Sequence, residues 1–260
     1  AGDDTFNWVV GDGNDTIDGG TNTGVGDLVN IDGDGTANTV TVAAATLAVG
    51  AEMIGYSAIE RIDIDGLGGD DTIAVNHLTG ATLSVDGGGA NAVTLTLGGS
   101  GELSSVTGGD TLTFAGASAG VTASLIAGTF KETSSAITHA VSSVENVVGS
   151  ASGDSIVGGT GSNVLQGGDG NDVLNGFDDA DVLYGGANDD QLQGGAGNDH
   201  LFGGAGVDQL NVSTGSDIAY FAGDEGIAGG DVDTLVGFTA TGIDSDKIAI
   251  LAGNGSGDFA

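Results

Sequence analysis

The stretch Gly149–Tyr220 consists of eight nonapeptides that follow one another without a gap. In order they read GSASGDSIV, GGTGSNVLQ, GGDGNDVLN, GFDDADVLY, GGANDDQLQ, GGAGNDHLF, GGAGVDQLN and VSTGSDIAY. Their sixth positions hold Asp154, Asn163, Asp172, Asp181, Asp190, Asp199, Asp208 and Asp217. Their eighth positions hold only apolar residues: Ile156, Leu165, Leu174, Leu183, Leu192, Leu201, Leu210 and Ala219. A fixed period of this kind indicates a repeat architecture in which each unit stacks on its neighbours.

The pattern resembles the nonapeptide G-G-x-G-x-D-x-U-x of the RTX (repeats-in-toxin) family, which binds calcium. The resemblance implies an all-β fold, namely a parallel β-roll or β-helix solenoid with stacked calcium-binding turns. In this fold two nonapeptides make one turn of the roll. Successive turns would lie about 4.8 Å apart, the spacing of neighbouring strands.

The residue types within each repeat suit this architecture. Glycine at the first, second and fourth positions permits backbone angles that a Cβ atom would forbid. We therefore expect the first six residues to form a tight turn with inward-pointing carbonyl groups. The last three residues would form a short strand whose middle side chain faces the interior.

Calcium takes six to eight oxygen ligands, more than one nonapeptide supplies. The resemblance implies that each sixth-position residue shares an ion with the one two repeats later. The implied pairs are Asp154 with Asp172, Asn163 with Asp181, Asp172 with Asp190, Asp181 with Asp199, Asp190 with Asp208, and Asp199 with Asp217. For the Asp172/Asp190 site we expect further ligands from the backbone carbonyl groups of Gly168, Gly170, Gly185 and Ala187.

Several residues depart from the consensus within the block, and four of them bear on the predicted sites. Asn163 lacks the charge of the other sixth-position residues, so its site should be weaker. Phe177 and Asp179 replace two turn glycines, which puts the geometry of that turn in question. Asn188 also replaces glycine, but asparagine tolerates the left-handed region of backbone space.

The first 147 residues contain weaker forms of the same turn. Gly2–Phe6, Gly13–Ile17 and Gly69–Ile73 resemble the second half of the nonapeptide, so Asp4, Asp15 and Asp71 are further candidate metal ligands. Alternating apolar and polar residues predict strands, for example at Thr39–Val42, Arg61–Ile64 and Thr111–Phe114. Ala43–Met53 is the best helix candidate, and its helical period is weak.

These patterns predict three regions. Residues 1–147 would form an irregular β-solenoid with degenerate RTX-like turns, and residues 148–220 the regular roll. Residues 221–260 would form a capping segment, because Asp231–Phe238 and Asp246–Ile250 resemble the end of the RTX domain of serralysin-type exoproteases. The chain opens at Ala1 without an initiator Met, and Phe259–Ala260 does not resemble a completed export signal. We therefore expect a fragment or a processed product, with a truncated cap.

The composition limits the function. The chain carries 37 acidic and 3 basic residues and a formal net charge of -34, so nothing in it can neutralise the phosphates of nucleic acid or an anionic membrane surface. No apolar run has the length needed for membrane insertion. Cations are the expected partners, because this many carboxylates would repel one another in a compact state. The chain has no Cys, which leaves no disulfide framework.

We expect no enzymatic activity. Gly116–Gly120 matches the G-x-S-x-G motif of hydrolases, but that motif needs a following helix, and Val121–Leu125 alternates like a strand. His77, His139 and His200 belong to no H-E-x-x-H zinc signature and are interpreted as surface residues.

The sequence therefore predicts a secreted bacterial protein that is extracellular or at the cell surface, exported by type I secretion, and folded on binding calcium. The preferred role is structural, in a surface layer, an adhesin or an extracellular filament, with copies joined end to end. The alternative is the C-terminal export and folding module of a secreted protease, lipase or epimerase. The repeat region of a pore-forming toxin is a third reading, which would need hydrophobic helices elsewhere.

Overall fold

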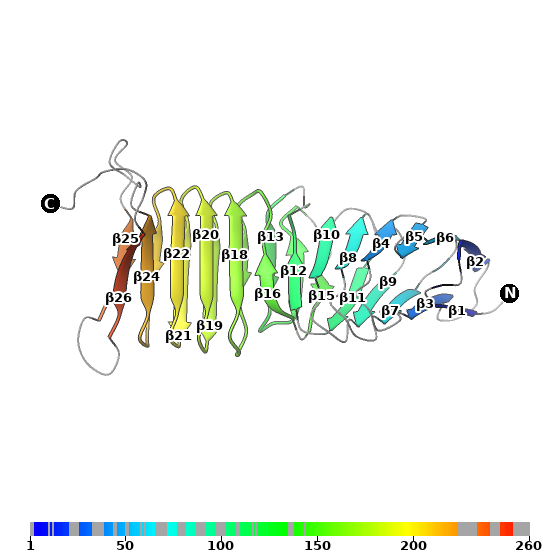
Figure 1. Ribbon diagram of the computed structural model, residues 1–260, viewed down its shortest axis with the longest axis horizontal. Coiled ribbons are helices and arrows are strands. Elements are labelled where there is room, and N and C mark those ends of the chain that lie inside the picture. The colour runs from blue at the N-terminus through cyan, green and yellow to red at the C-terminus, as the bar shows by residue number, and fades with distance from the viewer. Residues whose placement is uncertain are drawn as a thin grey trace. The chain divides into compact units, whose positions relative to one another are not determined.

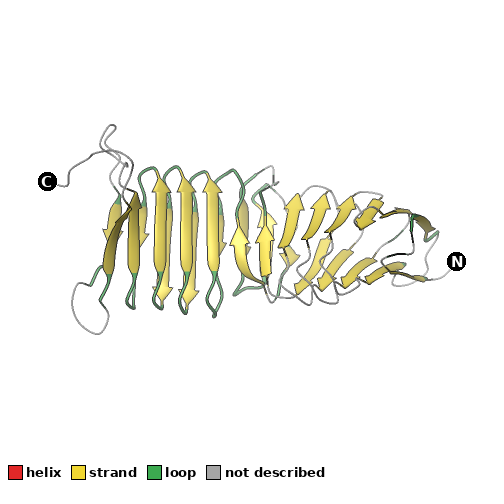
Figure 2. Cartoon of the chain, viewed as in Figure 1, coloured by secondary structure: helices red, strands yellow, loops and turns green. Residues whose placement is uncertain are grey.

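The computed structural model describes residues 3–9, 11, 13–20, 26–32, 39–43, 46–49, 52–57, 59, 61–65, 72–76, 82–86, 92–96, 102–107, 110–115, 117, 119–134, 138–142, 144–222, 233–239 and 245–251. Every regular element among these residues is a strand (Figure 2). The chain forms two compact units. We call residues 1–117 and 128–144 the N-terminal unit, and residues 118–127 and 145–260 the roll unit.

The roll unit contains two parallel sheets between which the chain alternates (Figure 1). One sheet has the order β16 (Val144–Val148), β18 (Val164–Asp169), β20 (Val182–Ala187), β22 (His200–Ala205), β24 (Ile218–Ala222) and β26 (Lys247–Leu251). The other has the order β13 (Val121–Ser124), β17 (Ser155–Val157), β19 (Val173–Asp178), β21 (Gln191–Ala196), β23 (Gln209–Asn211) and β25 (Thr234–Val236). Because partners lie two repeats apart, two nonapeptides make one rung.

The core of the roll unit is a row of eighth-position side chains. Ile156, Leu165, Leu183, Leu201, Leu210 and Ala219 are fully buried, and Leu174 and Leu192 are 1% exposed. The repeat register places each of these side chains directly above its equivalent in the next rung, as in the pairing of Leu165 with Leu183. Because every rung of the block has 18 residues, each of these positions meets its own equivalent in the rungs on either side.

The central strands of the roll are longer than the three residues expected. β18, β20, β21 and β22 each continue through the first three positions of the following repeat. The continuation occurs because the second-position glycines also pair between rungs, as in Gly168 with Gly186. The turn proper is therefore confined to positions four to six.

Three aromatic side chains form a ladder on the outer face of the first of these sheets. Phe202 stacks on Tyr184 with ring centroids 4.7 Å apart and on Tyr220 at 4.0 Å. All three occupy the ninth position of alternate repeats, so the stacking follows directly from the register of β20, β22 and β24.

The N-terminal unit also contains two sheets, with less regular rungs. A parallel sheet has the order β1 (Thr5–Val9), β3 (Leu28–Asp32), β7 (Arg61–Asp65), β9 (Thr82–Asp86) and β11 (Glu102–Thr107). Strands of the second follow the order β2 (Asp15–Asp18), β6 (Glu52–Ser57), β5 (Thr46–Val49), β4 (Thr39–Ala43), β8 (Thr72–Asn76), β10 (Ala92–Thr96) and β12 (Asp110–Thr113). A short antiparallel pair joins β14 (Thr129–Glu132) to β15 (His139–Ala140).

The predicted strands at Thr39–Val42 and Arg61–Ile64 appear as β4 and β7, and the one at Thr111–Phe114 overlaps β12. The weak helix candidate Ala43–Met53 is wrong. Its described residues belong to an antiparallel meander of β4, β5 and β6. The period-two pattern of Thr46–Val49 decides the outcome, because Leu47 and Val49 are buried while the residues beside them are half-buried.

Larger apolar side chains fill the core of the N-terminal unit, including Trp8, Ile31, Ile62 and Phe114. His139 corrects the expectation of a surface residue. It is buried, and its ring stacks on Phe130 at a centroid distance of 4.9 Å. His77 lies outside the described residues. None of the described residues forms a helix that is long and apolar enough to cross a membrane.

Candidate metal sites

The sixth-position side chains of the nonapeptides point into the turns and are buried. Each is at most 4% exposed. Each of the later ones accepts a hydrogen bond on Oδ1 from the backbone N–H of the sixth residue one rung earlier, at 2.7–2.9 Å. The donors and acceptors run Asp154 to Asp172, Asn163 to Asp181, Asp172 to Asp190, Asp181 to Asp199, Asp190 to Asp208, and Asp199 to Asp217. The structure therefore brings together all six predicted pairs, in two columns.

The second carboxylate oxygen is buried without a hydrogen-bond partner in the inner part of these columns. This is the state of Oδ2 in Asp172, Asp181, Asp190, Asp199 and Asp208. A buried carboxylate oxygen without a partner carries the full cost of its lost hydration.

A backbone carbonyl oxygen lies beside several of these carboxylate oxygens. A Cβ atom on Gly167 would collide with both Asp172 Oδ2 and the carbonyl oxygen of Gly185. The same holds at Gly176 for Asp181 Oδ2 and Gly194, and at Gly185 for Asp190 Oδ2 and Gly203. Two acceptor oxygens that meet without a donor need a proton or a cation between them. The first-position glycine leaves the space that such a group would need.

Burial raises the pKa of these carboxyl groups. The pKa of Asp172, Asp181 and Asp190 rises from 3.8 to about 7, and that of Asp208 to about 6. Loss of hydration is the main cause, and neighbouring carboxylates add to it, whereas the backbone N–H donors lower the pKa. The pKa values of Asp154 and Asp199 are raised for the same main reason. In the absence of a cation, the charged columns are therefore unfavourable at neutral pH.

The backbone carbonyl groups expected for the Asp172/Asp190 site lie between the two turns in three cases. The Gly168 carbonyl oxygen is directed at Gly186, and the Gly185 carbonyl oxygen is directed at Gly167. The Ala187 carbonyl oxygen accepts the Gly170 N–H at 3.1 Å. Gly170 also donates to Asn188 Oδ1, at 3.1 Å.

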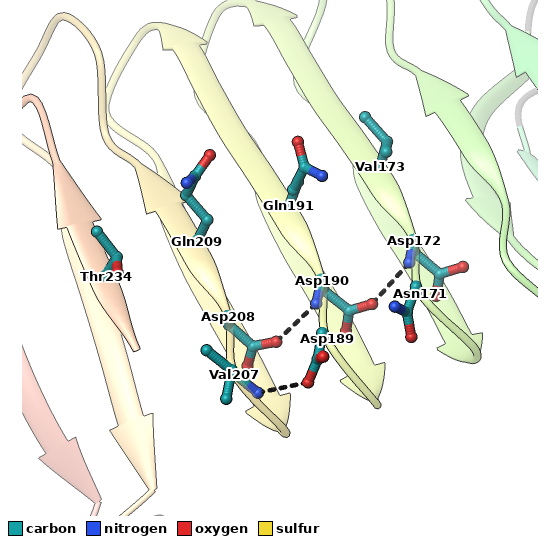
Figure 3. Close-up of a pocket in the computed structure, with 10 residues that line it drawn as sticks. All are labelled: Asn171, Asp172, Val173, Asp189, Asp190, Gln191, Val207, Asp208, Gln209 and Thr234. Atoms are coloured by element: carbon teal, nitrogen blue, oxygen red, sulfur yellow. Dashed lines mark hydrogen bonds between the residues drawn. The ribbon is translucent and has the colours of Figure 1, made fainter. Parts of the chain in front are cut away.

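The column of Asp172, Asp190 and Asp208 borders a groove of about 380 Å³. Figure 3 shows these three side chains on successive rungs, each directly before its strand (β19, β21 and β23) and joined by the hydrogen bonds from Asp172 N to Asp190 and from Asp190 N to Asp208. Gln191, Gln209 and Thr234 also line the groove. Solvent, and therefore a hydrated ion, can approach this column from the side.

The turn that departs most from the consensus keeps its geometry. Phe177 and Asp179 adopt φ angles of 86° and 65°, the left-handed conformations that glycine would otherwise supply. Their carbonyl oxygens are directed at Gly195 and Gly197 of the next rung, as in the regular turns. Each such residue costs on the order of 1–3 kcal/mol of backbone strain. Asn188, at φ 80°, is the substitution that the left-handed region tolerates best.

In the first residue of each column, protein groups donate hydrogen bonds to the side-chain oxygens, so these oxygens have partners. Asp154 Oδ2 accepts the Ser150 N–H at 2.6 Å, and its Oδ1 accepts the Val121 N–H at 2.6 Å and the Ser150 hydroxyl at 2.9 Å. Asn163 accepts the Gly159 N–H at 2.7 Å and donates to the Glu145 carbonyl oxygen at 2.7 Å.

Both columns continue one rung past the nonapeptide block. The Asp208 N–H donates to Asp233 Oδ1 at 2.9 Å, and the Asp217 N–H donates to Asp246 Oδ1 at 3.1 Å. Asp246 Oδ2 also accepts the Thr239 N–H, at 2.6 Å. The sequence prediction missed both residues because insertions lengthen these rungs to 25 and 29 residues. An aspartate two positions before an apolar residue, as in Asp233-Thr234-Leu235, is the feature that could have revealed them.

The N-terminal unit repeats the same pair of hydrogen bonds once among its described residues. The Asp4 N–H donates to Asp27 Oδ1 at 2.6 Å, and the Leu28 N–H donates to the Asp4 carbonyl oxygen at 2.9 Å. Asp27 is fully buried and was not predicted, because its rung has 23 residues. Asp15 is exposed within β2, and Asp71 lies outside the described residues.

The described residues contain no group of three or more His, Cys, Asp or Glu side chains that could hold a metal ion. An ion in these turns would therefore take much of its coordination from backbone carbonyl groups. Hard cations such as Ca²⁺ accept carboxylate and carbonyl oxygens together. The fold and the geometry of its turns therefore define the class of protein: a parallel β-roll whose stacked turns can hold a hard cation.

Comparison with known proteins agrees with this class. A family model for four copies of the RTX calcium-binding nonapeptide repeat matches residues 9–23, 148–183, 157–192, 175–210 and 184–219. These segments carry RTX calcium-binding nonapeptide repeats, and such repeats bind several calcium ions per domain. Proteins with these repeats are typically secreted by bacteria. A search of curated proteins gave no match to the chain.

Proposed function

We propose that this protein is a secreted bacterial structural protein whose roll unit folds on binding calcium. The observation that carries the proposal is the set of buried carboxylate oxygens without a hydrogen-bond partner, several of which face a backbone carbonyl oxygen. Such a fold is incomplete without a positive charge in each turn.

In this proposal the chain holds each ion between two rungs. Asp172 and Asp190 provide carboxylate oxygens, and the carbonyl oxygens of Gly168 and Gly185 are directed at Gly186 and Gly167 of the facing rung. Bound calcium supplies positive charge to oxygens that otherwise repel one another. The backbone N–H of each sixth-position residue orients the carboxylate of the next rung, so that in the folded roll each carboxylate is held in place for the ion.

Export explains why folding would depend on an ion. Extracellular calcium modules typically bind with dissociation constants of about 10⁻⁴–10⁻³ M, far above the free calcium of a cytosol. The chain would stay unfolded inside the cell, as type I secretion requires, and would fold outside.

A non-catalytic role in a surface layer, adhesin or filament is the preferred form of the proposal. It is supported by the described residues of both units, which form only strands and turns. The alternative role, an export and folding module of a secreted enzyme, shares the calcium chemistry. The two differ in assembly, because a structural component should associate end to end and a module should remain monomeric.

The test is circular dichroism of the purified chain in excess chelator and after addition of millimolar calcium. We expect a large gain of β signal on adding calcium, and no gain with magnesium at the same concentration. A full β spectrum in chelator would overturn the proposal. Light scattering of the calcium-loaded chain then separates the structural role from the module.

A further inference from the structure

We infer that a calcium site lies between Asp208 and Asp233, one rung beyond the nonapeptide block, and that Asp154 at the other end of the same column is no ligand. The inference rests on the proposed function, since it assumes that this column binds calcium. Compared with the pairs that the RTX resemblance implies, the calcium sites of this column lie one rung nearer the C-terminus. Asp233 lies outside the segments that match the RTX repeat.

The position of Oδ2, the buried carboxylate oxygen without a hydrogen-bond partner, shows on which side of each aspartate a calcium site lies. Asp172 Oδ2 shares the space beside Gly167 with the carbonyl oxygen of Gly185, which belongs to the following rung. Asp190 Oδ2 likewise shares the space beside Gly185 with the carbonyl oxygen of Gly203. In both cases the incomplete group faces the rung that follows.

Asp208 is in the same state at the end of the block. It is 1% exposed, its Oδ2 has no hydrogen-bond partner, and this oxygen lies beside the first-position glycine of its repeat, Gly203. Unlike at Gly167 and Gly185, the atoms nearest a Cβ on Gly203 all belong to Asp208, so the hydrogen bond to Asp233 Oδ1 is what assigns its site to the following rung. That rung contains no nonapeptide, and it carries Asp233.

Asp233 takes the place that a sixth-position aspartate would have. The Asp208 N–H donates to Asp233 Oδ1 at 2.9 Å, and the Thr234 N–H donates to the Asp208 carbonyl oxygen at 2.7 Å. One rung earlier, Asp190 donates to Asp208 Oδ1 at 2.9 Å, and Gln209 donates to the Asp190 carbonyl oxygen at 2.8 Å. The two hydrogen-bond pairs match, although the rung between Asp208 and Asp233 is longer than 18 residues.

Asp154 differs from the other aspartates of its column in its donors, although its Oδ2 also shares the space beside Gly149 with a carbonyl oxygen of the following rung, that of Gly167. Three donors, namely the Ser150 N–H, the Ser150 hydroxyl and the Val121 N–H, occupy both of its oxygens. Ser150 stands at the second position, where the equivalent repeats have glycine. These protein donors supply Asp154 with the partners that the oxygens further along the column lack, so the column begins with an end that does not need calcium.

The experiment counts calcium ions per chain by equilibrium dialysis for the full chain and two matched variants, Asp233→Asn and Asp154→Asn. Both exchange a carboxylate for an amide of the same shape. We expect Asp233→Asn to bind one ion fewer than the unchanged chain. Asp154→Asn should bind the same number of calcium ions as the unchanged chain. It should unfold at a lower temperature, because the amide NH₂ group of the new side chain would face one of the groups that donate hydrogen bonds to Asp154. Ser150→Ala, which removes only the hydroxyl, is the milder variant if Asp154→Asn does not fold.

The outcomes separate this inference from the proposed function. If the unchanged chain binds no calcium, the proposed function fails, and the inference fails with it. If the unchanged chain binds several ions and Asp233→Asn binds the same number, only the inference is overturned. The loss of one ion in folded Asp154→Asn or Ser150→Ala would also overturn it.

Discussion

Residues 145–222 of the roll unit repeat one rung of 18 residues. The rungs of the N-terminal unit differ in length, because Thr5 pairs with Leu28, Leu28 with Arg61 and Arg61 with Thr82. The roll unit fills its interior with one eighth-position apolar side chain per strand and buries a carboxylate in every turn of the block except that of Asn163. The N-terminal unit fills its interior with Trp8, Ile31, Ile62 and Phe114.

The difference shows two ways to hold a solenoid together. Large apolar side chains stabilise a rung by removing about 25 cal/mol of unfavourable hydration per Å² buried, whatever its length. Buried carboxylates stabilise it only where an ion can join them, and an ion fixes the geometry of two turns at once. Regular rungs are therefore expected where ions bind, and irregular rungs where apolar packing holds the chain together.

Chelation should have the largest effect and should separate the two units. In excess chelator we expect fast hydrogen exchange in β20, β21 and β22, because their turns lose their cations, and continued protection in β3 and β7 of the N-terminal unit. Hydrogen exchange measured by mass spectrometry, with and without calcium, tests this. Equal loss of protection in both units would show that the N-terminal unit depends on the same ions.

A shift of pH should have the next largest effect, because several carboxyl groups act together. Their pKa lies near 7 in the fold and near 3.8 when exposed, so the fold holds their protons more tightly than the unfolded chain does. This stabilisation is complete below about pH 4 and is lost as the pH rises through about 7. In chelator, the roll unit should therefore show a stronger β signal in circular dichroism at about pH 5 than at about pH 8. A β signal that weakens on acidification would contradict this.

Truncation of a core leucine should have a smaller effect, confined to one unit. Leu192→Ala should destabilise the calcium-loaded roll unit by about 2–5 kcal/mol, the usual range for a buried leucine. Ile62→Ala in β7 is the matched control, since it removes a side chain of equal burial from the N-terminal unit. Calcium titrations should show weaker binding for Leu192→Ala and unchanged binding for Ile62→Ala. Equal weakening in both would indicate that the units are energetically coupled.

Relief of turn strain should have the smallest effect. Phe177→Gly should stabilise the roll unit by about 0.5–1 kcal/mol, because the gain from a relaxed left-handed residue exceeds the entropy cost of glycine. Asn188→Gly should change stability less, since asparagine already tolerates its φ angle. Urea unfolding in calcium measures both. Destabilisation by Phe177→Gly would mean that the half-exposed ring contributes packing that outweighs the strain.

The nonapeptide period was enough to predict the parallel roll, the buried eighth position and the pairing of sixth-position residues across rungs. Each of these follows from a strict repeat, in which one position determines all its equivalents. Period-two alternation likewise located strands such as β4 and β7, although it did not exclude a helix at Ala43–Met53.

The features that escaped prediction depend on contacts between residues far apart in sequence. Asp27, Asp233 and Asp246 sit in rungs whose lengths break the period, so spacing alone could not reveal them. The satisfied state of Asp154 depends on Val121, 33 residues earlier, and on a serine side chain folded back onto the turn. The burial of His139 depends on its stacking against Phe130, which no repeat specifies.

The stacked rings of Tyr184, Phe202 and Tyr220 provide a spectroscopic probe of folding within the roll unit. The three rings come from three successive rungs, so they meet only when those rungs are in register. Exciton coupling between them should appear in near-ultraviolet circular dichroism at the moment of rung alignment. The single tryptophan of the chain, Trp8, belongs to the N-terminal unit, and its fluorescence reports that unit alone. Two wavelengths can therefore time the assembly of the two units in one unlabelled sample.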